Sequence, residues 1–212
     1  METFFKEAAQ LWSEAISIWR AGDWAMIAIA VISLVIFGLG MHVLLRLRAK
    51  GFRSVPEETW RQWIHRPAER SGAIGGILDF VTSARSVEDS VRCFEQVRQT
   101  ETVPFERDLK VMKICVGAAP LVGLLGTVTG MLATFGAIST GSGGDETMGM
   151  VAEGISEALI TTETGLVIAL PGLFFQYHLL RKYESYKAFL AHLESACTQV
   201  LYRRLRRQGR AA

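Results

Sequence analysis

Three long stretches of apolar residues stand out along this chain. They cover residues 24–45, 114–139 and 150–180, and each is longer than the roughly 20 residues that an α-helix needs to cross a hydrocarbon core of about 30 Å. The first two stretches carry no formal charge, and only glutamates interrupt the third. The pattern predicts an all-α membrane protein with three transmembrane helices, of which the second and third form a hairpin.

Basic residues are confined to the segments that flank these stretches. No Lys or Arg occurs in the 67 residues from Ile114 to Leu180, whereas bases cluster directly after the first and third stretches. Because bases accumulate on the cytoplasmic side of a membrane, the segments that hold these clusters are predicted to be cytoplasmic and the others to lie outside. The predicted segments are 1–23 outside, 46–113 in the cytoplasm, 140–149 outside and 181–212 in the cytoplasm.

The segments outside the bilayer are predicted to be helical as well. Apolar positions at helical spacing make residues 1–23 an amphipathic helix at the outer interface, and the acids among them disfavour a cleaved signal peptide, which begins with bases. Weak helical patterning covers residues 46–113, where Pro104 is expected to break the helix before the second span. The apolar spacing continues after the third span, so its helix is expected to extend through residues 181–212.

The sequence contains no arrangement typical of an enzyme, a cofactor site or a metal site. The stretch "GSGG" lacks the following Gly-Lys-Ser/Thr of a phosphate-binding loop. Cys93, Cys115 and Cys197 are odd in number and widely spaced, which argues against disulfides and against zinc. His192 and Glu194 near Cys197 are interpreted as surface and packing residues. We therefore expect no catalytic residue, no metal, no cofactor and no nucleic-acid partner.

Two glutamates and three threonines lie close together within the otherwise apolar third span. A carboxylate near the centre of a bilayer costs a few kcal/mol or more, so it normally faces a bundle interior or a watery path and has a function. At about 100° per residue, Glu157, Thr161 and Thr164 fall within about 60° of one another. Thr162 and Glu163 lie on the two flanks of that stripe. The pattern indicates an ion pathway, and hydrogen bonding between helices is the alternative for both glutamates.

The second span offers a surface for close packing. Gly123, Gly126 and Gly130 have the spacing of small residues that let membrane helices approach each other. Thr127 and Thr134 are seven residues apart and therefore lie on one side of the same helix. We expect this side to face the third span.

The symmetry of the hairpin predicts which polar residues share a level in the membrane. A turn around residues 144 and 145 places position 162 level with Thr127, and a threonine stands there as well. A ring of hydroxyl groups at mid-membrane is therefore expected, with Glu157 slightly outside it.

The motifs "AAPLVGLLGTVTGM" and "GISEALITTETGLVIALPG" resemble the two signature helices of the ExbB, TolQ and MotA proton-channel family, most closely those of ExbB and TolQ. The resemblance covers roughly residues 106–186. It implies that Thr127 in the Gly-Thr-Val motif, Glu157 in Glu-Ala-Leu, and Thr162 form the ion pathway. Further pore-lining positions are expected at Thr134, Thr161, Glu163 and Thr164.

The resemblance also implies an assembly, partners and a location. Family members form rings in the bacterial inner membrane, pentameric in ExbB-like proteins, so that the outer side is the periplasm. Each ring surrounds a single-span ExbD- or TolR-like partner with a membrane aspartate. The expected function is that of an ExbB-like subunit of a proton-driven motor, which acts through that partner and a TonB-like protein to energise outer-membrane transport. A TolQ-like subunit of the Tol-Pal system, coupled to a TolA-like protein, is the alternative.

Departures from the family pattern leave other functions open. Thr129 stands where ExbB and TolQ usually have Trp, and Glu163 and Thr164 replace an apolar pair. The added oxygens would also suit the dehydration of sodium. A flagellar stator subunit is disfavoured because three spans rather than four are predicted. A non-conducting membrane scaffold is the remaining alternative.

Overall fold

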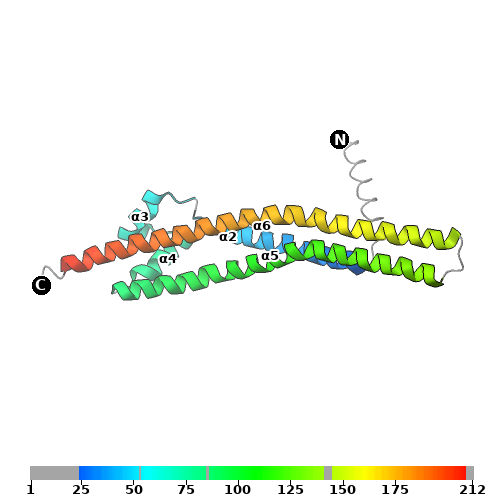
Figure 1. Ribbon diagram of the computed structural model, residues 1–212. Coiled ribbons are helices and arrows are strands. Elements are labelled where there is room, and N and C mark those ends of the chain that lie inside the picture. Colours follow the sequence, from blue (N-terminus) through cyan, green and yellow to red (C-terminus); the bar gives the residue numbers. More distant parts are fainter. Residues whose placement is uncertain (1–23, 53, 85, 141–144, 209–212) are drawn as a thin grey trace, which may run out of the picture. The chain divides into compact units, whose positions relative to one another are not determined.

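The computed structural model describes residues 24–208 apart from positions 53, 85 and 141–144. All secondary-structure elements of the described residues are helices (Figure 1). The amphipathic helix predicted for residues 1–23 lies outside the described residues. The elements are α2 (Trp24–Ala49), α3 (Glu57–His65), the 3-10 helix η1 (Pro67–Glu69), α4 (Gly72–Thr82), α5 (Val87–Thr140) and α6 (Asp145–Gln208).

Three of these helices, α2, α5 and α6, are long and apolar enough to cross a membrane, in agreement with the three predicted spans. The helices extend beyond the predicted limits of the spans. α5 begins at Val87 rather than near residue 114, and α6 begins at Asp145 rather than near residue 150. Residues 141–144 separate α5 from α6, whereas the predicted loop comprises residues 140–149.

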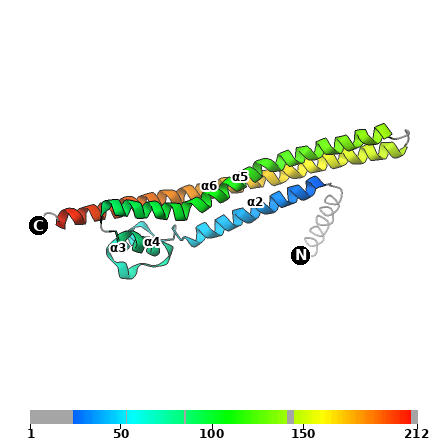
Figure 2. The ribbon, with the colours of Figure 1, turned by 90° about the horizontal axis from the view of Figure 1, so that it is seen from below.

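The chain divides into two compact units. The first contains the residues up to Gly38 together with Met112–Phe175, and the second contains Leu39–Val111 together with the residues from Gln176 onward. Within each unit, parts of α5 and α6 lie side by side (Figure 1, Figure 2). The short helices α3 and α4 belong to the second unit.

Close contact between three apolar helices holds the first unit together. Gly172 of α6 lies against Val116 of α5 and Ile36 of α2, since a Cβ added at Gly172 would be 3.2 and 3.3 Å from methyl carbons of these residues. The rings of Phe37 and Phe175 stack with their centroids 6.4 Å apart. Many large apolar side chains of the three helices are exposed. Such an exterior is expected of helices that lipid surrounds.

Aromatic side chains form the core of the second unit. The Phe105 ring of α5 lies 6.2 Å from the Tyr183 ring and 6.3 Å from the Tyr186 ring of α6, measured between centroids. Trp60 of α3 meets Phe189 edge to face at 6.1 Å. Aromatic pairs at such distances contribute about 1 kcal/mol beyond the burial of their surface. The rings thus tie α3, α5 and α6 to one another.

α5 continues through Pro104, so the helix break predicted at this residue is wrong. A proline in a helix interior costs about 3 kcal/mol because it removes a backbone hydrogen bond and crowds the preceding turn. On both sides of Pro104 the helix is anchored by burial, at Thr102 and at Phe105. Packing against α6 therefore outweighs the local preference of the proline.

The three cysteines are free thiols, and their surroundings predict different reactivity. Burial raises the pKa of the Cys197 thiol to about 11, whereas Cys93 is only half-buried. At pH 8 we expect Cys197, kept as the single cysteine, to react with a maleimide roughly tenfold or more slower than Cys93 kept alone, because burial disfavours the Cys197 thiolate and restricts access to the sulfur. Mass spectrometry of timed samples measures both rates, and equal rates in folded protein would contradict the burial of Cys197.

Candidate ion pathway in the helical hairpin

Glycines bring the backbones of α5 and α6 close together in the first unit. A Cβ added at Gly123 would lie 2.8 Å from the carbonyl oxygen of Thr161, and one at Gly130 would lie 3.0 Å from that of Gly154. A Cβ at Gly126 would collide with the side chain of Thr161. All three glycines of α5 that the sequence singles out therefore lie where a side chain does not fit.

α6 contributes glycines of its own, which the sequence reasoning missed. Gly154 and Gly165 are both buried. A Cβ at Gly165 would lie 2.8 Å from the carbonyl oxygen of Ala119, and one at Gly154 would collide with the methyl group of Thr134. The two glycines are eleven residues apart, about three helical turns, and so occupy one face. That spacing was the available signal for a second small-residue surface.

These contacts fix the register of the antiparallel hairpin. Gly123 lies against Thr161 and Thr162, and Gly126 lies against Thr161. Gly130 lies against both Gly154 and Ala158. Because Thr127 follows Gly126, its level on α6 falls between Glu157 and Thr162, within about one helical turn of each. The expected ring of hydroxyl groups with Glu157 slightly outside it stays a prediction.

Glu157 lies within about one helical turn of the level of Thr127, and both residues are half-buried. Glu157 and Thr162 are five residues apart, which separates them by about 140° around α6. Between them lies Thr161, which is 1% exposed and faces α5. A single chain therefore brings Glu157 to one flank of the hairpin contact and Thr162 to the other.

The hydroxyl groups of the two candidate threonines donate to backbone carbonyls. Thr127 Oγ1 donates to the Leu124 carbonyl at 2.7 Å, one turn earlier in α5. Thr162 Oγ1 donates across the hairpin to the Gly123 carbonyl at 3.0 Å. Since each carbonyl takes the hydrogen of the hydroxyl, the oxygen keeps lone pairs that can accept another hydrogen bond. Both threonines can therefore accept a hydrogen bond from water or from a protonated carboxyl group.

The other predicted pore-lining residues have different surroundings. Thr134 and Thr161 are buried between α5 and α6, with 3% and 1% of their surface exposed. Thr164 is half-buried and donates to the Ile160 carbonyl at 2.8 Å. Glu163 is exposed. Within this chain Thr134 and Thr161 take part in helix packing, whereas Glu163 is open to its surroundings.

The charge pattern of this region favours proton chemistry. From Ile114 to Leu180 the chain has no Lys or Arg, and its histidine, His178, stands near the end of that segment. A charge in an apolar setting is costly, and uptake of a proton removes it. Within the described ranges no group of His, Cys, Asp and Glu residues is placed to hold a metal ion. The hairpin is suited to a carboxyl group that takes up and releases a proton.

The fold and the site together define the class of protein. It is a helical membrane protein that carries a carboxyl group and hydroxyl groups in a hairpin of long helices. The sequence profile of the MotA/TolQ/ExbB proton channel family matches residues 71–191, more than half of the chain. This chain belongs to that family, which confirms the resemblance of its two motifs. The family is one of channels and not of enzymes, in agreement with the expectation from the sequence.

Named relatives are similar over parts of their length. The biopolymer transport protein ExbB-like 1 of Synechocystis sp. is 40% identical over 77 residues, which are 36% of this chain and 30% of the relative. The biopolymer transport protein ExbB of Xanthomonas campestris pv. campestris is 33% identical over 110 residues, 52% of this chain and 41% of the relative. The Tol-Pal system protein TolQ of Haemophilus influenzae is 27% identical over 117 residues, which are 55% of this chain and 50% of the relative. The chain therefore spans half or less of the length of these relatives.

Proposed function

We propose that this chain is an ExbB-like subunit of an inner-membrane motor that the proton motive force drives. Membership of the proton channel family and the ExbB names of several relatives support this function. The observation that carries the proposal is the placement of half-buried Glu157 within about one helical turn of Thr127, in the hairpin of α5 and α6. Thr127, Glu157 and Thr162 are the residues to which we assign the ion pathway.

A carboxyl group within a bilayer can carry a proton across part of its path, because it can take up a proton and release it again. The ionised group is costly near the bilayer centre, and the neutral group is not. The oxygens of Thr127 and Thr162 can accept hydrogen bonds from the protonated Glu157 or from water. Each proton that crosses releases about 2.3 kcal/mol per 100 mV of membrane potential. This energy would move an ExbD- or TolR-like partner with its own membrane aspartate, and a TonB-like protein would pass the work to outer-membrane transport.

A complete pathway requires more than one copy of the chain. Glu157 and Thr162 lie on opposite flanks of the contact between α5 and α6, so one hairpin cannot line a closed path with both. Where neighbouring hairpins meet, the flank of one can face the flank of the next, and a ring closes this arrangement by symmetry. A homopentamer, as in ExbB-like proteins, is the proposed ring.

The proposed orientation places the N-terminus in the periplasm and the C-terminus in the cytoplasm. The last turn of α2 holds Arg46 and Arg48, and Arg181 and Lys182 directly follow the third predicted span in α6. Bases collect on the cytoplasmic side, so the cytoplasmic ends are the end of α2, the start of α5 and the end of α6.

Two related functions have support of their own. The match to a TolQ protein keeps a TolQ-like subunit of the Tol-Pal system as the second candidate. A sodium-driven relative is favoured by the additional oxygens of Thr129, Glu163 and Thr164. In either case the chain would still be a subunit of an ion-driven motor.

Ion flux into liposomes tests the proposed function. The chain is purified in mild detergent, the copurifying single-span protein is identified by mass spectrometry, and both are reconstituted around a pH-sensitive dye. When a potential is imposed, we expect proton uptake that requires both proteins and is unchanged when choline replaces sodium. Uptake that requires sodium would assign the chain to the sodium-driven class. Uptake no faster than in protein-free liposomes would overturn the conducting role.

A further inference from the structure

A basic cavity of about 720 Å³ lies in the second unit, between the C-terminal part of α6 and the segment of α3, η1 and α4. Its volume is in the range of small-molecule sites, about 300–1,000 Å³. No acidic side chain is among the described residues that line it. Its basic lining consists of His65, Arg70, Arg203, Arg204 and Arg207.

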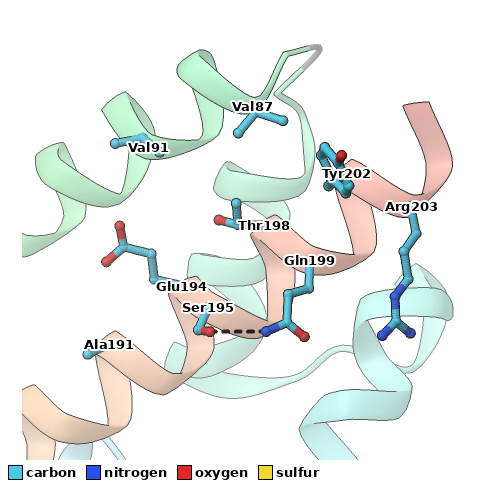
Figure 3. A pocket seen from close by; sticks show the side chains of 9 residues that line it. All are labelled: Val87, Val91, Ala191, Glu194, Ser195, Thr198, Gln199, Tyr202 and Arg203. Carbon is cyan, nitrogen blue, oxygen red and sulfur yellow. Dashed lines mark hydrogen bonds between the residues drawn. The ribbon is translucent and has the colours of Figure 1, made fainter. Parts of the chain in front are cut away.

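The basic lining from α6 occupies one face of the helix. Val200, Arg203, Arg204 and Arg207 follow the spacing of neighbours on a helix surface, three and four residues apart. Earlier in α6 the same face is apolar and packed, since Cys197 is 5% exposed. Figure 3 shows a different pocket, on the side of α6 that meets α5, which Arg203 also borders; there the Arg203 side chain points away from Val87 and Val91 of α5. The face that elsewhere packs the core thus becomes basic where it borders the cavity.

These arginines lack acidic partners within the described part of the chain. None of Arg203, Arg204 and Arg207 forms an ion pair there. Like charges four residues apart, as in Arg203 and Arg207, repel each other. Basic residues near the C-terminus of a helix interact favourably with its dipole wherever they stand around the helix. Arg206 does so from outside the cavity, so the dipole does not explain why the other arginines border the cavity. A cavity with this charge is therefore complementary to an anion from outside the chain.

Arg70 gives the cavity a rigid wall. Its side chain is 4% exposed, and its guanidinium donates to the carbonyl oxygen of Trp63 at 2.7 Å and to Thr82 Oγ1 at 2.8 Å. It also pairs with Asp79 at 2.7 Å. Among the described residues Asp79 forms its ion pair with Arg70 and none with the arginines of α6.

We propose that this cavity binds a soluble phosphate-bearing anion, an organic polyphosphate of about nucleotide size. Guanidinium groups bind phosphate oxygens through paired hydrogen bonds, and several of them together suit a polyphosphate. Ile64 and Val200 add apolar surface for an organic part. In the proposed topology Arg203 lies about 33 Å along α6 from Arg181, the first base after the third span. That distance favours a cytoplasmic ligand over the phosphate of a lipid headgroup.

Titration calorimetry on the full chain in detergent tests this site, with tripolyphosphate and ADP as probes at physiological salt. We expect saturable binding that the double variant Arg203→Gln/Arg207→Gln weakens roughly tenfold or more. The control, Arg92→Gln/Arg206→Gln, removes two exposed charges outside the cavity and should change the affinity less than about twofold. Equal losses in both variants, or no saturable binding to the wild type, would overturn the proposal. The readout does not depend on ion flux, so the proposed channel function can fail or succeed separately.

A second measurement needs no variant and so does not depend on its folding. Tripolyphosphate should protect Arg203, Arg204 and Arg207 from phenylglyoxal, while Arg92 is modified at an unchanged rate, as mass spectrometry of peptides would show. Nanodiscs distinguish the lipid source. If phosphatidylglycerol protects these arginines relative to phosphatidylcholine and tripolyphosphate does not, the site binds headgroups and the soluble-ligand proposal is overturned.

Discussion

Replacing Glu157 by glutamine is expected to lower proton flux through the reconstituted channel roughly tenfold or more, while the protein still assembles with its partner. Glutamine has nearly the size and hydrogen-bonding capacity of a protonated glutamate, but it cannot release a proton. If Glu157 is a step in the pathway, its exchange of protons is the property that matters. Dye-reported proton uptake in liposomes with matched protein content measures the effect.

Glu153 provides the matched control for this experiment, because it is assigned no part in the pathway. It lies four residues before Glu157 in α6 and is exposed, whereas Glu157 is half-buried. Glu153→Gln removes the same charge from the same helix, so we expect its flux to stay within about twofold of the wild type. Wild-type flux in Glu157→Gln would show that Glu157 only joins helices by hydrogen bonds. An equal loss in both variants would indicate a general effect of charge.

Much of the fold could be predicted from the sequence because its signals are local. The lengths of the apolar stretches determine that three helices can cross a bilayer, whatever they pack against. The spacing of Gly123, Gly126 and Gly130 requires only that a second helix lies nearby. Charge-free length and small-residue spacing are properties of single segments, and they do not depend on contacts that are distant in the sequence.

The site was less predictable because its details depend on contacts between segments. The level of Thr162 follows from its contact with Gly123, which the midpoint of a loop does not specify. The stripe of Glu157, Thr161 and Thr164 has the predicted spacing, but the helix contact buries Thr161 and leaves Glu157 half-buried. Pro104 is tolerated in α5 because α6 supplies aromatic partners that lie far away in the sequence.

Replacing Gly154 by alanine is expected to destabilise the hairpin. The added methyl group would collide with the Thr134 methyl, which is held in place because the Thr134 hydroxyl donates to the Met131 carbonyl at 2.7 Å. A β-branched side chain in a helix has few alternative rotamers. Overpacking of this kind costs about 1–3 kcal/mol, and we expect a lower Tm in detergent together with reduced flux. Thermal unfolding followed by intrinsic fluorescence measures the change in stability.

A second substitution can show that this collision is the cause. Thr134→Ser removes the methyl group, and the remaining Thr134 Cβ is 3.7 Å from the position of the new methyl, an ordinary contact distance. The double variant should therefore recover most of the lost Tm. Gly149→Ala is the control, because a Cβ there meets nothing within 4 Å and alanine favours a helix over glycine by about 1 kcal/mol. If Gly154→Ala were as stable as Gly149→Ala, or if Thr134→Ser restored nothing, α5 and α6 would not approach each other in the way that sets the level of Glu157.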